Sequence, residues 1–492
     1  MEDLTLAKHV EAIALVVGQL LIVGVVGARV ILTRHPPGSS FAWLLLVAVF
    51  PVVGLAAYML IGERRIGRRR AEFARQFFAR VPPAVAALAD DARSESGRLA
   101  PPWDGLARLA TSATGMPPLS GSSFQLQDGA ERILRSIVAD VDAAQTSVEM
   151  EFYIWNAGGT ADEVAEALAR ATARGVTVRL LLDALGSTEF LKSGWPARMR
   201  AGGIELQVAL AVKPWKIPFR RIDLRLHRKI VVVDGRIGYT GSMNLVDPRF
   251  FKQGDNVGEW VDAMVRAEGP IVGALRTVFE FDWGMQTGTL TDPGAGAAET
   301  GSTVQPLPGG TQVAQVIMSG PGVDEAANLR VITQAVNDAR SRIVLTTPYF
   351  VADGSLALAL QNAAMRGCRV TLILPARNDS WLVEHASRWY FDDLARAGVE
   401  IRRYTGGLLH TKSITFDGAV ALFGTANLDI RSLSLNFELM LAIYDETFAA
   451  QLLELQLGYV RDSFPVVLRE WRERPVSARL LEGIASMAAP LL

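Results

Sequence analysis

The chain has 492 residues, which is too long for one ordinary domain, and half of them are hydrophobic, so it can bury a large core. Its 50 basic and 51 acidic residues nearly cancel, which argues against a globally basic nucleic-acid-binding protein and against an acidic, disordered chain. Cys368 is the only cysteine, which excludes a disulfide framework and a cysteine-based metal site.

Two apolar stretches near the start of the chain predict membrane-spanning helices. Residues 12–28 carry no charge, and residues 41–62 are also uncharged. About 20 apolar residues suffice to cross a bilayer as a helix, so each stretch is a candidate span, and a kink at Pro51 is tolerated within the second. A cleaved signal peptide is the alternative for the first stretch, but Glu2 and Asp3 are untypical of its basic start.

Arginines come directly after the second stretch and predict the orientation of this anchor. Because basic residues flanking a span stay on the cytoplasmic side, the chain from residue 63 onward is expected in the cytoplasm, as the catalytic part of a multi-pass membrane protein. The same side chains could instead hold anionic lipid headgroups. These arginines are Arg64, Arg65, Arg68, Arg69, Arg70 and Arg75.

Composition divides the chain into five segments. Residues 1–62 form the two-span membrane anchor, and residues 63–118 are rich in arginine and alanine, which predicts a basic helical linker. Residues 290–319 are rich in glycine and proline and predict a second linker. The two remaining segments, 119–289 and 320–492, are similar in size and repeat each other.

Both copies of the repeat show the same order of elements. A helix leads to a β-branched strand that ends in Tyr153 in the first copy and in Tyr349 in the second. A second helix then leads to a buried strand, and a strand with a histidine follows. This alternation of strands and helices predicts an α/β fold in each half.

The histidine-containing strands carry one motif twice. HRKIVVVDGRIGYTGSMN covers residues 227–244, and HTKSITFDGAVALFGTAN covers residues 410–427. Histidine and lysine are rare in this chain, so two matching copies at equivalent places of a repeat are a strong signal. The paired positions are His227 and His410, Lys229 and Lys412, Asp234 and Asp417, Ser242 and Thr425, and Asn244 and Asn427.

The spacing within each motif brings its polar side chains to one surface. Residues i and i+2 of a strand face the same side, so each histidine points with its lysine. An Asp-Gly pair then predicts a tight turn, after which a second strand returns the hydroxyl and the amide towards them. Asp234 and Asp417 are candidates for catalysis, or they cap these turns without touching substrate. Two facing copies place two imidazoles and two ammonium groups around one point.

This set of groups suits an anionic phosphodiester. The lysines, asparagines and hydroxyls can bind the phosphate oxygens. One neutral histidine can attack phosphorus, and the other can protonate the leaving oxygen. No metal or other cofactor is expected, because the lysines supply the positive charge that a metal would otherwise supply. Asp262 and Glu438 follow the two motifs on strands, and either can hold a histidine in the required tautomer.

The first copy contains an insertion at residues 209–226 that mixes basic and aromatic side chains. Such a mixture suits lipid headgroups at a membrane surface, single-stranded nucleic acid, or an ordinary surface loop. The residues concerned are Lys213, Trp215, Lys216, Phe219, Arg220 and Arg221.

The two motifs resemble the paired HKD motifs of the phospholipase D superfamily. The flanks GSMNLVDPRFFKQ and GTANLDIRSLSLNFEL, with the apolar N-terminus followed by ERRIGRRR, resemble the bacterial cardiolipin synthase family. The resemblance implies two α-β-α sandwich halves that share one active site, in a multi-pass protein of a bacterial inner membrane. It implies that two phosphatidylglycerol molecules condense into cardiolipin and glycerol through a phosphatidyl-histidine intermediate, with the lipid bilayer and not nucleic acid as partner.

Other activities stay open at this point. A phospholipase D-type hydrolase, a membrane-tethered nuclease of the same superfamily and a non-catalytic scaffold are the alternatives. The two intact pairs of histidine and lysine argue against the scaffold, and the near-zero net charge argues against the nuclease. Only the acceptor, a lipid alcohol or water, separates the transferase from the hydrolase. The symmetric motif does not indicate which histidine attacks phosphorus, and the sequence does not indicate the oligomeric state.

Overall fold

The computed structural model divides into two compact units. One comprises residues 1–68 and 212–224, and the other comprises residues 69–211 and 225–492, so the two predicted halves belong to one unit. Arg64, Arg65 and most of the insertion at 209–226 lie outside the residues that the structure describes. The described residues are 2–33, 37–63, 67–89, 99–211, 221, 223–252, 254, 256–290, 307 and 309–487.

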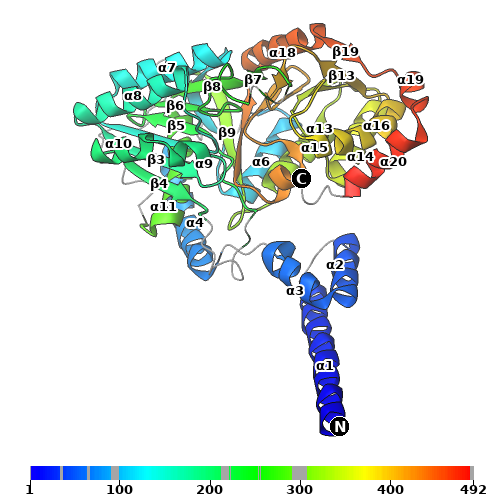
Figure 1. The fold of residues 1–492 in the computed structure, drawn as a ribbon. Helices are drawn as coiled ribbons and strands as arrows, with labels where there is room; N and C mark the ends of the chain where they lie inside the picture. The colour runs from blue at the N-terminus through cyan, green and yellow to red at the C-terminus, as the bar shows by residue number, and fades with distance from the viewer. Residues whose placement is uncertain are drawn as a thin grey trace. The chain divides into compact units, whose positions relative to one another are not determined.

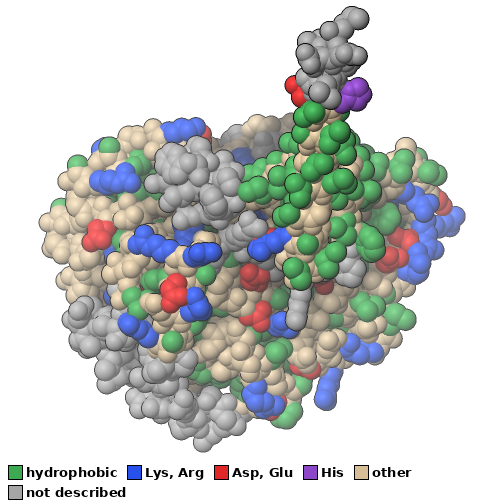
Figure 2. All heavy atoms as spheres, turned by 90° about the horizontal axis from the view of Figure 1, so that it is seen from below, with side chains coloured by type: hydrophobic (Ala, Val, Ile, Leu, Met, Phe, Trp, Pro, Cys, Tyr) green, Lys and Arg blue, Asp and Glu red, His purple; other side chains and the backbone are tan. Residues whose placement is uncertain are grey.

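The N-terminal unit begins with a long apolar helix, α1 (Glu2–Leu32). Its hydrophobic side chains are mostly exposed, for example Leu20 at 66% and Val25 at 68%, and Figure 2 shows them around the helix. The 25 residues Lys8–Leu32 are apolar enough to cross a membrane, and at a rise of about 1.5 Å per residue they are also long enough for the hydrocarbon core. Within the described part of the chain, this is the one helix that meets both conditions.

The second apolar stretch is not a single helix, which differs from the expected second span. Its elements are α2 (Pro37–Val49), α3 (Pro51–Ala57) and a π-helical segment (Tyr58–Gly62). Pro51 has no N–H to continue the helix, and Phe50 before it adopts φ −129° and ψ 72°. Gly54 then lies so close to α2 that a Cβ there would be 2.7 Å from the Cα of Val47. The anchor is one candidate span followed by two short helices that pack on each other.

One sheet of fifteen strands runs through the described part of the larger unit (Figure 1), in the order β19-β13-β12-β10-β15-β16-β18-β9-β1-β8-β6-β5-β2-β3-β4. β1 and β9 are antiparallel neighbours at its centre. Outward from β1 the order β8-β6-β5-β2-β3-β4 matches the order β18-β16-β15-β10-β12-β13 outward from β9. The predicted repeat is therefore confirmed, and the two halves are joined edge to edge.

The strands of the first half are β1 (Leu119–Asp128), β2 (Ser147–Phe152), β3 (Thr177–Asp183), β4 (Glu205–Ala209), β5 (Ile230–Val233), β6 (Ile237–Gly241) and β8 (Ala263–Glu268). Those of the second half are β9 (Gln312–Ser319), β10 (Arg342–Thr346), β12 (Arg369–Pro375), β13 (Glu400–Tyr404), β15 (Ser413–Phe416), β16 (Val420–Gly424), β18 (Glu438–Tyr444) and β19 (Ser463–Pro465).

Helices cover both faces of the sheet in each half. The helices of the first half are α7 (Ala130–Ala143), α8 (Thr160–Ala173), α9 (Thr188–Lys192), α10 (Trp195–Ala201) and α11 (Pro270–Thr287). Those of the second half are α13 (Ala327–Asp338), α14 (Gly354–Met365), α15 (Trp381–Trp389), α16 (Phe391–Ala397), α17 (Ile430–Ser434), α18 (Glu446–Arg461), α19 (Leu468–Arg472) and α20 (Val476–Met487).

β2 shows how the two layers of helices arise. Val148, Met150 and Phe152 alternate along the strand and join the apolar core beneath α7 and α8. Glu149 points to the opposite face, where it accepts a hydrogen bond from Arg276 of α11 at 3.1 Å. Each half is thus an α-β-α sandwich, as the resemblance implied.

Two segments expected as linkers belong to the folded unit. α4 (Arg68–Ala89) places Phe73 and Phe77 against Phe281 of α11. α6 (Trp103–Thr114) buries its apolar face in the core of the second half, although it precedes the first half in the chain. β9 occupies residues 312–319, so the second half begins before residue 320. The ends of the folded unit are set by apolar faces that pack against its core, and composition alone does not indicate them.

The predicted Asp-Gly turns close the hairpins β5–β6 and β15–β16. Asp234 and Asp417 have φ of 52° and 53°, and each is followed by a glycine that also has positive φ, as a tight hairpin turn requires. The Asp417 carboxylate accepts hydrogen bonds of 2.8 Å from the backbone N–H groups of Arg340, Ser341 and Arg342. The Asp234 carboxylate binds the backbone of residues 145–147 in the same way. Both side chains therefore join a turn to the neighbouring loop, which differs from the expected catalytic position.

Asp417→Ala is expected to lower the stability of the larger unit by about 1–3 kcal/mol, because it leaves backbone donors without their acceptor. The measurement is the thermal midpoint of the purified protein in detergent, with activity normalised to folded protein. Asp417→Asn, which keeps one acceptor oxygen, is the matched control and should lose less. A normal midpoint together with a thousandfold loss of activity would contradict the capping role.

Candidate active site

Two short strand pairings between the halves assemble the site. β7 (Trp260–Val261) pairs in parallel with β14 (Leu408–Leu409), so the His410 N–H donates to the carbonyl of Val261 at 2.9 Å. The equivalent bridge joins residues 226 and 437, and the His227 N–H donates to the carbonyl of Phe437 at 3.0 Å. Each histidine thus lies beside the backbone of the opposite half. The residue that accepts its N–H is followed in the chain by an acidic residue, Asp262 after Val261 and Glu438 after Phe437.

Those acidic side chains bind the histidines across the halves. His227 Nδ1 lies 2.9 Å from the Glu438 carboxylate, and His410 Nδ1 lies 2.7 Å from the Asp262 carboxylate. All four side chains are buried, and both carboxylates are at most 1% exposed. A carboxylate accepts a hydrogen bond from Nδ1–H, which leaves the Nε2 lone pair of each neutral ring available. The two predicted acids thus lie where they can orient the histidines, each from the other half of the chain.

The hydroxyl groups of the motifs bind these carboxylates and not the open site. Ser242 Oγ donates to Asp262 at 2.6 Å, and Thr425 Oγ1 donates to Glu438 at 2.6 Å. Both residues are fully buried. This differs from the expected phosphate-binding role. Each hydroxyl binds a carboxylate, and that carboxylate binds the histidine of the other motif. The arrangement gives two chains of hydroxyl, carboxylate and imidazole that cross between the halves.

Each lysine binds the backbone carbonyl of the histidine of its own motif. Lys229 Nζ donates to the carbonyl of His227 at 2.6 Å, and Lys412 Nζ donates to the carbonyl of His410 at 2.5 Å. Their side chains are 0% and 1% exposed. An ammonium group has three donors, so each lysine retains two beyond this bond, although neither lysine is among the residues that line the cavity described next.

Burial sets the charge states of the empty site. Desolvation lowers the pKa of His227 and of His410 to about 4, although a carboxylate contacts each ring. It lowers the pKa of Lys229 to about 8 and that of Lys412 to about 7. Both histidines are therefore neutral at pH 7, and the lysines are the groups that titrate near physiological pH.

The Nε2 side of the histidines faces a cavity of about 380 Å³. Asn244 and Asn427 also line it, as the motif predicted. Asn244 Oδ1 accepts from the N–H of Ile154 at 3.1 Å, while its buried Nδ2 has no protein partner among the described residues. An unpartnered amide donor beside two histidines fits an oxygen-rich ligand.

The cavity is also lined by residues that lie outside the two motifs and that the motifs do not predict. The Tyr153 ring meets His227 edge-on at 5.0 Å between centroids, and the Trp260 ring lies 4.2 Å from that of His410. Lys252 of the first half and Tyr349 of the second both bind Asp379, at 2.9 and 2.8 Å, and so join the halves at the cavity wall. Tyr153 and Tyr349 follow the equivalent strands β2 and β10 of the repeat, which is the signal that could have identified them.

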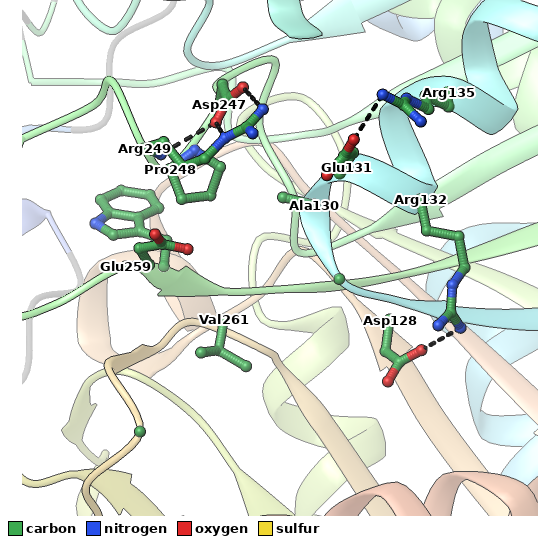
Figure 3. A pocket seen from close by; sticks show the side chains of 13 residues that line it. Asp128, Ala130, Glu131, Arg132, Arg135, Asp247, Pro248, Arg249, Glu259 and Val261 are labelled. Atoms are coloured by element: carbon green, nitrogen blue, oxygen red, sulfur yellow. Dashed lines mark hydrogen bonds and ion pairs between the residues drawn. The ribbon is translucent and has the colours of Figure 1, made fainter. Parts of the chain in front are cut away.

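A larger cavity, of about 820 Å³, shares Trp260 with this site. Six of its seven charged side chains form three pairs (Figure 3): Asp128 with Arg132 at 2.8 Å, Glu131 with Arg135 at 2.7 Å, and Asp247 with Arg249 at 2.7 Å. The predicted site residues do not line it. Chemistry, rather than size, identifies the smaller cavity as the candidate active site.

Comparisons with known proteins identify the family of the chain. The family model "Cardiolipin synthase, PLD-like domain" matches residues 137–283 and 332–455, and the model "Phospholipase_D-nuclease N-terminal" matches residues 22–63. Cardiolipin synthase A of Proteus mirabilis is 42% identical over 477 residues and covers 96% of each chain. Cardiolipin synthase A of Escherichia coli is 40% identical over 484 residues, which are 97% of this chain and 98% of the relative.

A solved structure supports the fold independently. The crystal structure of phosphatidylserine synthase from Haemophilus influenzae aligns with a TM-score of 0.57 at 15% identity, over 78% of this chain and 98% of the other. The sandwich halves agree with both kinds of match. This chain belongs to the cardiolipin synthase family of phospholipase D-like proteins.

Proposed function

We propose that the protein is a phosphatidyltransferase that condenses two phosphatidylglycerol molecules into cardiolipin and glycerol. The observation that carries the proposal is the pair of buried histidines in one cavity, each with Nδ1 on a carboxylate of the opposite half and with a lysine beneath it. Nearly full-length similarity to cardiolipin synthases A supports the choice of substrate.

The lysines and Asn244 bind the phosphodiester of the donor lipid. Moving an ammonium group out of water is costly, and an anion in contact with it offsets that cost. The substrate thereby raises the lysine pKa values again and keeps both groups charged. The same anion raises the pKa of a neighbouring histidine, so one of the two rings becomes protonated only when substrate is bound.

The first step transfers the phosphatidyl group to the protein. Nε2 of the neutral histidine attacks phosphorus, and the bond between phosphorus and the headgroup glycerol oxygen breaks. The protonated second histidine gives its Nε2 proton to that oxygen, and glycerol leaves. The lysines stabilise the negative charge of the five-coordinate transition state. The pKa values of the two rings are alike, so either histidine can take either role.

The second step transfers the group to a lipid alcohol. A headgroup hydroxyl of another phosphatidylglycerol attacks phosphorus, the second histidine takes its proton, and the bond from phosphorus to histidine breaks. The acceptor brings a second phosphate, and Arg225 and Arg431 line the same cavity where they can bind it. A cavity of about 380 Å³ admits headgroups, so the acyl chains stay in the bilayer.

The same proposal sets the location of the enzyme. We propose an inner-membrane protein with its catalytic unit in the cytoplasm, where basic side chains after the anchor are favoured. Arg68, Arg69, Arg70 and Arg75 follow the apolar segments directly. Nucleic acid is not a substrate in this proposal, and no metal or other cofactor takes part.

The purified protein in vesicles with phosphatidylglycerol alone and EDTA is expected to form cardiolipin and glycerol in equal amounts, since two lysines supply the positive charge. Mass spectrometry of the lipids, with an enzymatic assay for glycerol, makes the measurement. Phosphatidic acid in place of cardiolipin would identify water as the acceptor and a hydrolase as the enzyme.

His227→Ala and His410→Ala are each expected to lower cardiolipin formation by roughly 10³-fold or more, because one ring attacks and the other transfers the proton. His385→Ala, which changes a histidine on α15 outside the site, is the control and should keep normal activity. Trapping of a phosphatidyl-histidine in one of the two inactive variants would assign the nucleophile. Substantial turnover in either variant would exclude a shared site.

The value of kcat/KM is expected to fall as the pH rises through about 7 to 8, because the lysines of the empty site lose their protons there. It should fall again below a pH of about 4, where the nucleophilic histidine is protonated. Lys412→Arg, which stays charged, should move the alkaline limb to higher pH at a lower maximal rate. Lys192→Arg, at an exposed position, should leave the profile unchanged. A flat profile between pH 6 and 9 is the result that contradicts the lysine assignment.

A further inference from the structure

The C-terminal helix α20 carries an exposed apolar stripe. Val476, Leu480, Ile484 and Met487 are 76%, 63%, 56% and 81% exposed. Their spacing of four, four and three residues places them on one side of the helix. Scattered apolar side chains on a surface are ordinary, but four large ones in a row along one helix face indicate an interaction surface.

The opposite side of α20 is firmly packed. Ala485 is buried with Val351 and Val383 of the second half, and Glu482 forms an ion pair with Arg474. Gly483 lies on the stripe side of the helix, where a Cβ would be 3.0 Å from the ring of Trp389, itself 51% exposed. The stripe is therefore the outer side of a fixed helix, drawn in red in Figure 1.

The helix is joined to the active-site wall through one side chain. Val383 of α15 packs against Ala485 on one side and lines the active-site cavity on the other. Trp381, which begins α15 directly after the cavity residue Ser380, is 58% exposed. Leu185 lines the same cavity and is 57% exposed. Large apolar side chains thus occur both on α20 and at the cavity itself.

Basic side chains lie beside the stripe. A second cavity, of about 350 Å³, is lined where α15, α16, α19 and α20 meet, and four of its five arginines form ion pairs with Glu384, Asp392 or Glu482. The five arginines are Arg388, Arg396, Arg472, Arg474 and Arg479. Apolar and aromatic side chains flanked by arginines are the composition that binds the interface of an anionic bilayer.

We infer that the apolar stripe of α20, with Trp381 and Leu185, is a membrane-docking face that holds the mouth of the active-site cavity against an anionic bilayer. The inference rests on the proposed lipid substrate. A headgroup must reach the histidines while its acyl chains stay in the membrane, so the mouth has to meet the lipid surface directly. Docking through this face also limits the access of water, which competes with the lipid alcohol for the histidine-bound intermediate.

A fluorescent label on the stripe tests the contact without using activity. Leu480→Cys in the full chain is labelled with bimane and reconstituted into vesicles of phosphatidylglycerol and phosphatidylcholine, with bromine on the acyl chains of the latter. Leu358→Cys on α14, which is 57% exposed in the native chain, is the matched control, and the native Cys368 is buried at 4% exposure. Quenching at position 480 should exceed quenching at position 358 by about threefold or more, as a dipped face requires.

Two results would overturn the docking face. One is equal quenching at the two positions. The other is a blue-shifted but unquenched label at position 480, which would mean that a second copy of the chain covers the stripe. Neither result depends on cardiolipin being formed, so failure of the proposed function and failure of the docking face remain distinguishable.

A charge placed on the stripe tests its role in turnover. Leu480→Glu with Ile484→Glu should lower activity on vesicles by about tenfold or more, and should change turnover of dispersed dihexanoyl phosphatidylglycerol by less than about twofold. Leu358→Glu with Met365→Glu adds the same charge to exposed positions of α14 and should keep both activities. Normal activity of the α20 variant on vesicles would overturn the inference, and the quenching measurement decides the matter if that variant does not fold.

Discussion

Each histidine of the site is held by a carboxylate from the other half of the chain, and the rest of the site depends on this exchange. The bonded partners are 211 residues apart for His227 and Glu438, and 148 residues apart for His410 and Asp262. Neither half alone contains both members of a pair. The central pairing of β1 with β9 fixes the halves edge to edge, and the two short bridges then bring each acid to its histidine. Each half holds one histidine and the acid that binds the other histidine. The continuous sheet brings the two halves together into one complete site.

The electrostatics of the site follow from the same exchange. When both are protonated, Lys229 and Lys412 balance the carboxylates of Asp262 and Glu438, and both histidines are neutral, so this buried set of six groups carries no net charge. Such a balance matters because an unpaired buried charge costs several kcal/mol. A phosphodiester adds one negative charge, which protonation of one histidine neutralises. In the proposed mechanism, the substrate itself therefore produces the difference between nucleophile and acid that the symmetric motifs do not contain.

Much of the fold and of the candidate site could be predicted from the sequence, because these features depend on the local spacing of residues. The repeat, the Asp-Gly hairpins and the alignment of each histidine with its lysine all follow from strand and turn periodicity. Which acid meets which histidine could not be predicted, because that contact is set by packing between the halves. Ser242 and Thr425 bind carboxylates of their own half, 20 and 13 residues further along the chain, and these contacts depend on how neighbouring strands pair, which the motif does not indicate. Pro51 marks the break at Phe50 in the sequence, but the close packing of α3 on α2 at Gly54, which replaces a kinked span by two short helices, is not reported by hydropathy.

Helix α6 adds a consequence for how the unit is made. It precedes the first half in the chain, yet Leu106, Ala107 and Ala110 complete the core of the second half. Gln315 also donates to the carbonyl groups of Ala107 and Met116, across about 200 residues of chain. During synthesis, this amphipathic helix emerges long before the surface that covers it. The first half is therefore enclosed between two pieces of the second, and the order of the chain itself ties the two sandwiches into a single cooperative fold.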